Sequence, residues 1–223
     1  MSSILSHVTS CLNSFIQLFQ QNPYDFLFEA EIQAILYASL RNAIREKVEL
    51  PVELFRDQIG DDRIRSSIVK AGYPSMEKFD IAIIHPETRR GVSEGGTNNA
   101  FWSQNLLGAI ELELYHVGEA IERKLNALLW DMDKLRGFRN VDPKLEFEFG
   151  FAFLFSTTSD QVFELIRKKD FEVDKVSEIE EANGVLGYII TDESKYRVSK
   201  RVVTMKEVME KYGTKGNRGN RDL

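Results

Sequence analysis

An apolar run with a single carboxylate in it, FDIAII at residues 79–84, constrains the fold of this chain more than any other segment. The run is short, rich in β-branched residues and followed by Pro86, which predicts a β-strand. Because side chains alternate along a strand, Asp80 shares a face with Ala82 and Ile84, and the other apolar residues take the opposite face. We therefore expect burial on both faces, where an aspartate is uncommon.

Two long helices are expected before this strand, and a short one through Phe55 and Ile59 follows them after Pro51. The second is predicted over residues 25–47, after Pro23, with Asp25 as its N-cap. Its predicted apolar face consists of Ile32, Ile35, Leu36, Leu40 and Ala43. The first helix covers the N-terminal region, because apolar residues recur there at helical spacing: Ile4, Val8, Leu12, Phe15, Ile16 and Phe19.

The rest of the chain predicts a mixed order of elements. Residues 71–74, AGYP, are typical of a turn, and the polar residues 87–105 predict a long loop. Gly137 is expected to end a helix predicted at residues 119–136. Further strands are predicted at 64–70, 107–115, 145–155 and 185–191, and further helices at 119–136, 160–169 and 204–212.

This order, α-β-β-β-α-β followed by a mixed α/β extension, predicts an α/β fold in which helices flank a core sheet with several adjacent strands. We expect one domain over residues 1–212 and a flexible basic tail at 213–223.

Composition and missing motifs exclude several classes of protein. The net charge of −6 argues against a surface that binds polyanions everywhere, although a local basic groove stays open. The single cysteine, Cys11, excludes a disulfide framework within the chain and favours a reducing cytoplasm. No run of about 18 apolar residues exists, so no membrane span is expected. Walker, GxGxxG and GxSxG motifs and zinc-ligand spacing are also absent.

Three further acids stand at unusual or patterned positions. Glu29 projects among the apolar residues of the second predicted helix. Glu111 and Glu113 alternate with apolar residues in AIELEL and therefore share one face of a strand. Taken alone, such a pair is usually an ordinary solvated face, and Glu146 and Glu148 show the same pattern.

Taken together, the acids follow a known order. A helix glutamate, a strand aspartate and a later strand glutamate resemble the PD-(D/E)xK nuclease superfamily, and Glu29, Asp80 and Glu111 match its acids. The resemblance covers about residues 25–155 and implies a restriction-endonuclease-like fold. Glu113 stands where the family usually has lysine. Some members supply that lysine from a neighbouring element; Lys78, on the Asp80 face, is the nearest candidate here, with Lys70 and Lys124 weaker ones.

The resemblance implies a Mg²⁺ or Mn²⁺ site. Clustered carboxylates repel one another, and a divalent cation that prefers oxygen ligands removes that penalty. Asp80, Glu111 and the backbone carbonyl of Leu112 would bind the metal, and Glu113 would orient water or act as general base. Glu29 would support these ligands or bind a second metal.

The expected activity is therefore metal-dependent hydrolysis of DNA phosphodiester bonds, with RNA as substrate and a homodimer left open. Residues that could contact DNA phosphates are Arg63, Arg65, Arg89, Arg90 and the segment 195–201. The alternatives are a non-catalytic scaffold that binds nucleic acid or protein on a degenerate nuclease-like fold, and an unrelated α/β domain with ordinary surface acids.

Overall fold

The computed structural model describes residues 2–47, 68–73, 78–84, 106–141, 147–159, 162, 164, 166 and 171–201. The predicted short helix through Phe55 and Ile59, the loop at 87–105, the helix at 204–212, the tail at 213–223 and Arg63, Arg65, Arg89 and Arg90 lie outside these residues. Of the predicted helix at 160–169, only Val162, Glu164 and Ile166 are described, and all three are helical.

Within the described residues, seven strands form one mixed sheet in the order β1-β2-β3-β4-β6-β7-β5. The central pairs β3–β4 and β4–β6 are parallel, and the pairs on both sides of them are antiparallel. The strands are β1 (Val69–Tyr73), β2 (Phe79–Ile84), β3 (Leu106–Tyr115), β4 (Phe149–Ser156), β5 (Phe171–Val176), β6 (Gly184–Ile190) and β7 (Lys195–Arg201).

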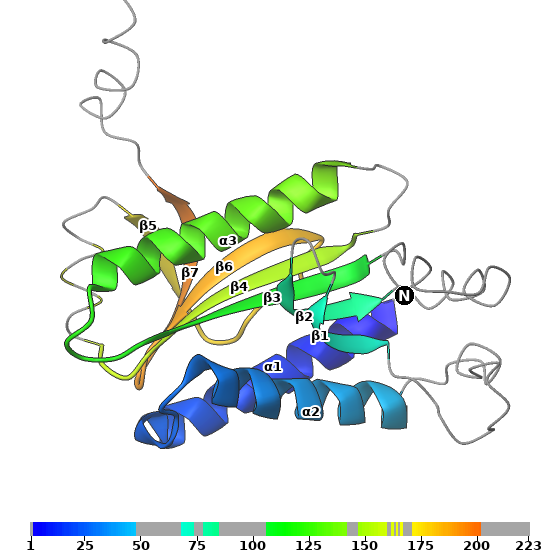
Figure 1. The fold of residues 1–223 in the computed structure, drawn as a ribbon, viewed down its shortest axis with the longest axis horizontal. Coiled ribbons are helices and arrows are strands. Elements are labelled where there is room, and N and C mark those ends of the chain that lie inside the picture. The colour runs from blue at the N-terminus through cyan, green and yellow to red at the C-terminus, as the bar shows by residue number, and fades with distance from the viewer. Residues whose placement is uncertain are drawn as a thin grey trace, which may run out of the picture.

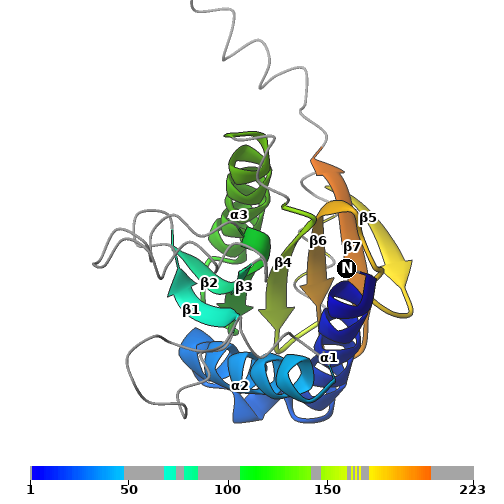
Figure 2. The same ribbon diagram turned by 90° about the vertical axis from the view of Figure 1, so that its right-hand side faces the viewer.

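In the part of the chain that the structure describes, three long helices cover the two faces of this sheet, and a short 3-10 helix, Pro23–Asp25, joins the first two. Figures 1 and 2 show α1 (Ser2–Gln21) and α2 (Glu29–Lys47) on one face and α3 (Ile121–Val141) on the other. From α2 to β4 the order is α-β-β-β-α-β. The prediction of an α/β fold, with helices flanking several adjacent strands, is confirmed.

The core has an aromatic centre on the face covered by α1. All six apolar residues predicted for the first helix are buried. Phe15 and Phe19 of α1 contact Phe155 of β4, with ring centroids 5.6 and 4.9 Å apart. On the other face, α3 packs so closely on β6 that a Cβ atom at Gly187 would collide with the side chain of Met132. The sheet is therefore buried on both sides along β3 and β4.

The start of α2 differs from the prediction. The helix begins at Glu29, and Asp25, the predicted N-cap, ends the 3-10 helix instead. Oε2 of Glu31 accepts the backbone N–H groups of Leu27 and Phe28, at 2.7 and 2.9 Å. A glutamate in the first turn thus satisfies N–H groups ahead of the helix, as in a capping box.

The predicted apolar face of α2 was wrong at one position. Ile35 is 41% exposed, whereas Ile32, Leu36 and Leu40 are buried as predicted. Ile44 is also buried. The buried side chains follow spacings of four residues, which keep them on one stripe, and Ile35 lies beside that stripe.

Two glycine predictions were also wrong. Gly137 does not end a helix, because α3 continues to Val141. The predicted turn at residues 71–74 is strand as far as Tyr73, since Ala71 pairs with Ile81 and Tyr73 with Phe79. Gly72 lies between these pairs with a φ of 59°, a left-handed conformation that glycine adopts easily. Strands β5 and β7 were not predicted.

Candidate functional site

At Asp80, hydrogen bonds from backbone N–H groups to side-chain carboxylates replace the backbone pairing between β2 and β3. The two strands pair from Ile84, opposite Leu106, to Ile81, opposite Ile110. One residue further, the N–H of Asp80 donates to Oε2 of Glu111, at 3.1 Å, and Oδ2 of Asp80 accepts the N–H of Leu112, at 2.8 Å. Two carboxylates thus occupy the place where β2 and β3 separate.

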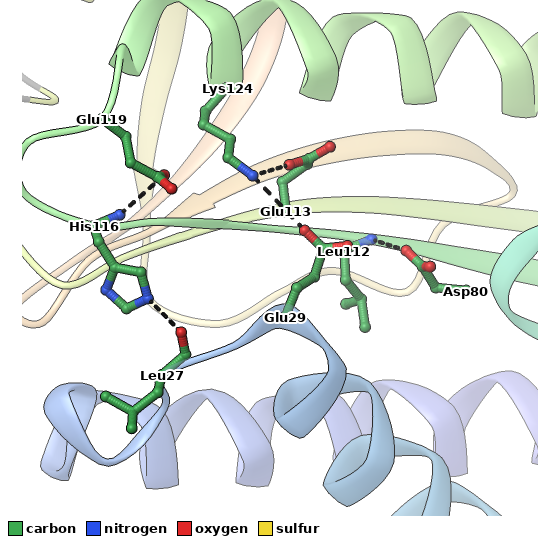
Figure 3. Close-up of polar contacts among 8 residues, drawn as sticks. All are labelled: Leu27, Glu29, Asp80, Leu112, Glu113, His116, Glu119 and Lys124. Atoms are coloured by element: carbon green, nitrogen blue, oxygen red, sulfur yellow. Dashed lines mark hydrogen bonds and ion pairs between the residues drawn. The ribbon is translucent and has the colours of Figure 1, made fainter.

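The backbone N–H of Leu114, two residues further along this edge of β3, is also bound by a carboxylate. Glu29, the first residue of α2, accepts a hydrogen bond from the backbone of Leu114. The end of β3 is held near this helix, because Nε2 of His116 lies 3.1 Å from the carbonyl oxygen of Leu27 (Figure 3). Since alternate N–H groups of a strand point to the same side, Leu112 and Leu114 face the edge of β3 that is no longer paired with β2. Asp80 and Glu29 accept hydrogen bonds from these two residues.

Helix α3 places two lysines against these acids. Nζ of Lys124 lies 2.7 Å from Oε2 of Glu113 and 3.8 Å from Oε2 of Glu29, so it connects β3 with α2 (Figure 3). Nζ of Lys134 lies 2.5 Å from Oε1 of Glu111, donates to the carbonyl of Lys78 and sits 4.8 Å above the centre of the Phe79 ring.

A fifth carboxylate, Asp131, belongs to the same site and also comes from α3. Its electrostatic neighbours include Glu113, Lys134 and Asp80. Asp131 lies seven residues after Lys124 and three before Lys134, intervals that bring side chains to neighbouring sectors of a helix. We refer to Glu29, Asp80, Glu111, Glu113 and Asp131 as the acidic cluster.

Glu29, Asp80, Glu111 and Asp131 hold their protons more tightly than ordinary carboxyl groups. Burial, together with the charges of Glu113 and Asp80, raises the pKa of Glu29 to about 7. Burial also raises the pKa of Glu111 to about 8, although Lys134 opposes the shift. The pKa of Asp131 rises to about 7 through burial and Glu113, and that of Asp80 is raised mainly by burial. Negative charge therefore accumulates at a cost, which a cation would relieve.

Four residues predicted from the sequence meet in this cluster: Glu29, Asp80, Glu111 and Glu113. Leu112 contributes its N–H to Asp80, and its carbonyl projects from the same edge of β3, since both groups of one residue point to the same side. The predicted Lys78 lies beside the cluster, but its side chain is exposed and its backbone carbonyl makes the contact.

Sequence reasoning missed Asp131 and Lys134 and ranked Lys124 below Lys78. A signal was present, because the three polar residues occupy one flank of a helix whose apolar stripe was recognised. Their contacts depend on how α3 lies across β3.

The donor chemistry of the cluster suits a hard divalent cation, since carboxylate and backbone carbonyl oxygens are the ligands that Mg²⁺ and Mn²⁺ prefer. In the described part of the chain, no three acidic, histidine or cysteine side chains are already arranged as metal ligands. Lysines and backbone N–H groups hold the carboxylate oxygens instead.

Comparison with protein-family models, curated proteins and solved structures finds no match to this chain. Among the described helices, none combines the length and the apolar character needed to cross a bilayer.

Proposed function

We propose that this protein is a metal-dependent nuclease that hydrolyses phosphodiester bonds, with a restriction-endonuclease-like core like that of the PD-(D/E)xK superfamily. The order of elements from α2 to β4 supports this proposal, as do the positions of Glu29, Asp80 and Glu111 on α2, β2 and β3. The observation that carries it is the pair formed by Asp80 and Glu111 where β2 and β3 separate.

Asp80, Glu111 and the carbonyl of Leu112 would hold the cation. When bound, Mg²⁺ or Mn²⁺ would lower the pKa of a water molecule and stabilise charge that develops on the scissile phosphate. Burial is the main cause of the raised pKa values of Glu111 and Asp80, and the charge of Asp80 raises the pKa of Glu111 further. A cation bound between the two carboxylates would stabilise their charged forms, which supports cation binding.

Lys134 is our candidate for the lysine that Glu113 replaces on β3. An ammonium group has three N–H donors, and two of them are used by Glu111 and the carbonyl of Lys78 within the described residues. The third can donate to a phosphate oxygen. Contact with Glu111 and Lys78 fixes Lys134 before substrate binds, which reduces the cost of reorganisation in the transition state.

Glu113 and Glu29 have supporting roles in this proposal. Glu113 is paired with Lys124 and is 20% exposed, so it can orient or deprotonate an attacking water. Glu29 binds the backbone of Leu114 and lies near Lys124, and it therefore positions the edge of β3 that carries Glu113.

The test is cleavage of labelled oligonucleotides by the full chain with Mg²⁺ or Mn²⁺, using single-stranded DNA, duplex DNA and RNA. We expect Glu111→Gln to reduce the rate by a factor of about 100 or more. Glu178→Gln, an exposed glutamate outside the cluster, is the matched control and should retain the wild-type rate. The proposal fails if the wild type cuts none of the three substrates, or if Glu111→Gln cuts as fast.

One observation favours the alternative of a non-catalytic scaffold that binds nucleic acid or protein. Lys124 and Lys134 already pair with Glu113 and Glu111, so a metal is not needed to neutralise these two carboxylates. A melting temperature that does not change with millimolar Mn²⁺, together with no cleavage, would favour this alternative.

A further inference from the structure

An exposed aromatic residue immediately precedes the cluster carboxylate at the start of α2 and another precedes the cluster carboxylate within α3. Phe28 comes immediately before Glu29 and is 66% exposed, and Trp130 comes immediately before Asp131 and is 74% exposed. Large aromatic side chains are seldom left this exposed, because burying one gains a large apolar area. Two of them, each next in sequence to a residue of the acidic cluster, indicate a ligand with flat apolar faces.

Trp130 is also close to positive charge. Lys134 follows it by four residues on α3, and side chains at this interval are neighbours on a helix surface. Arg123 precedes Trp130 by seven residues, which places the two about 20° apart around the helix axis. Arg123 is exposed, as is Lys78, whose carbonyl is bound by Lys134. Trp130 therefore lies between two basic residues, Arg123 and Lys134, along this flank of α3.

We propose that Trp130 and Phe28 stack on unpaired nucleobases and that the substrate is a single-stranded or locally unpaired nucleic acid. This inference rests on the proposed function. Grooves that bind single strands combine basic groups for the phosphates with aromatic side chains for successive bases. In a duplex the faces of the bases are already stacked on one another, so a tryptophan on the convex surface of a helix cannot reach them.

Lys134 connects phosphate binding at the acidic cluster with base stacking on Trp130. A nucleotide whose phosphate contacts Lys134 brings a neighbouring base within reach of Trp130, one helical turn away. Phe28 would receive a base on the opposite side of the cluster, beside Glu29 and Lys124. The strand would then cross the acidic cluster with its backbone toward Glu111 and its bases held outside.

Tryptophan fluorescence tests the stacking directly. The chain has two tryptophans, so Trp102→Phe leaves Trp130 as the only one. In EDTA, which prevents cleavage, titration with a 12-nucleotide oligothymidylate should quench the emission, and a blunt 12-base-pair duplex should require at least about 10-fold higher concentration. No quenching by the single strand, or equal quenching by the duplex, would overturn the proposal.

Fluorescence anisotropy of the labelled oligothymidylate, also in EDTA, tests the same idea without removing Trp102. Trp130→Ala and Phe28→Ala should each weaken binding about 10-fold, whereas Trp130→Phe should retain most of it. The control is Leu18→Ala, an exposed apolar residue of α1 that adjoins no cluster carboxylate, and it should bind like wild type. Unchanged binding in both alanine variants would overturn the proposal.

The two proposals fail in different ways. Stacking without cleavage in Mg²⁺ or Mn²⁺ would retain the single-strand site and remove the nuclease. Cleavage of single-stranded and duplex DNA at equal rates, unchanged in Trp130→Ala, would retain the nuclease and remove the single-strand site.

Discussion

The ammonium group of Lys134 lies 2.5 Å from Oε1 of Glu111, although the two residues are 23 positions apart and belong to different layers of the fold. Glu111 is 3% exposed, and its other carboxylate oxygen accepts the N–H of Asp80. Both oxygens of a buried glutamate are thus bound by a helix on one side and a neighbouring strand on the other. This arrangement makes Lys134 the first residue to test.

We predict that Lys134→Ala lowers the rate of nucleic acid cleavage by a factor of about 100 or more, because the variant loses a fixed positive charge beside the proposed metal ligands. Lys78→Ala, the variant that the sequence pattern favours, should keep the wild-type rate, since the contact of Lys78 with Lys134 is made by its backbone carbonyl and its side chain is exposed. Single-turnover kinetics of both variants check this. A slow Lys78→Ala and a fast Lys134→Ala would reverse the assignment.

The stability of the metal-free protein should decrease as the pH rises from about 5 to 8. The folded chain raises the pKa of Glu29 and Asp131 to about 7 and that of Glu111 to about 8, from ordinary values near 4. Between these limits the folded state binds more protons than the unfolded state, so the free energy of unfolding falls with rising pH.

Thermal melts in EDTA across this pH range measure the effect. Glu111→Gln removes one of the titrating groups, so its melting temperature should decrease less steeply than that of the wild type. Parallel curves for the two proteins would show that Glu111 does not carry a raised pKa.

Substitutions of Asp80 should separate its structural role from metal binding. Asp80→Asn keeps an oxygen that can accept the N–H of Leu112 and removes a charge from the cluster, so we expect stability in EDTA equal to or above wild type. Asp80→Ala leaves that N–H without its partner and should cost about 1–3 kcal/mol.

Neither Asp80 variant should show the increase in melting temperature that millimolar Mn²⁺ is expected to give the wild type, because stabilisation by a ligand requires its binding site. Urea unfolding in EDTA and melts with Mn²⁺ provide the two measurements. A full Mn²⁺ shift in Asp80→Asn would exclude Asp80 as a ligand.

Gly137→Ala should stabilise the protein by about 1 kcal/mol, because glycine is unfavourable within a helix and a methyl group at this position meets open space. The contrasting variant is Gly118→Ala, which should be destabilising, since Gly118 has a φ of 101°. Urea denaturation of both variants tests the finding that α3 continues past Gly137. A destabilised Gly137→Ala would indicate that the helix ends there.

Most of the regular elements could be predicted because their signals are local. The periodicity of residues 4–19 identified α1, and the apolar run at 79–84 coincides with β2. Local signals failed where distant backbone pairing decided the outcome. Ala71 and Gly72 have residue types typical of a turn, but they belong to β1 because this segment pairs with β2. Strand β7 lies between β6 and β5, although its sequence is strongly polar.

By itself, the sequence determined that a buried strand carries Asp80 and that Glu111 and Glu113 share one face of another strand, because these follow from side-chain spacing along single elements. Only the tertiary structure decided which lysine side chains contact these acids. Lys134, rather than Lys78, binds Glu111, and Lys124 connects Glu113 with Glu29. The reason is physical: desolvation and ion pairing depend on how α3 packs across β3, and no pattern within one element specifies that contact.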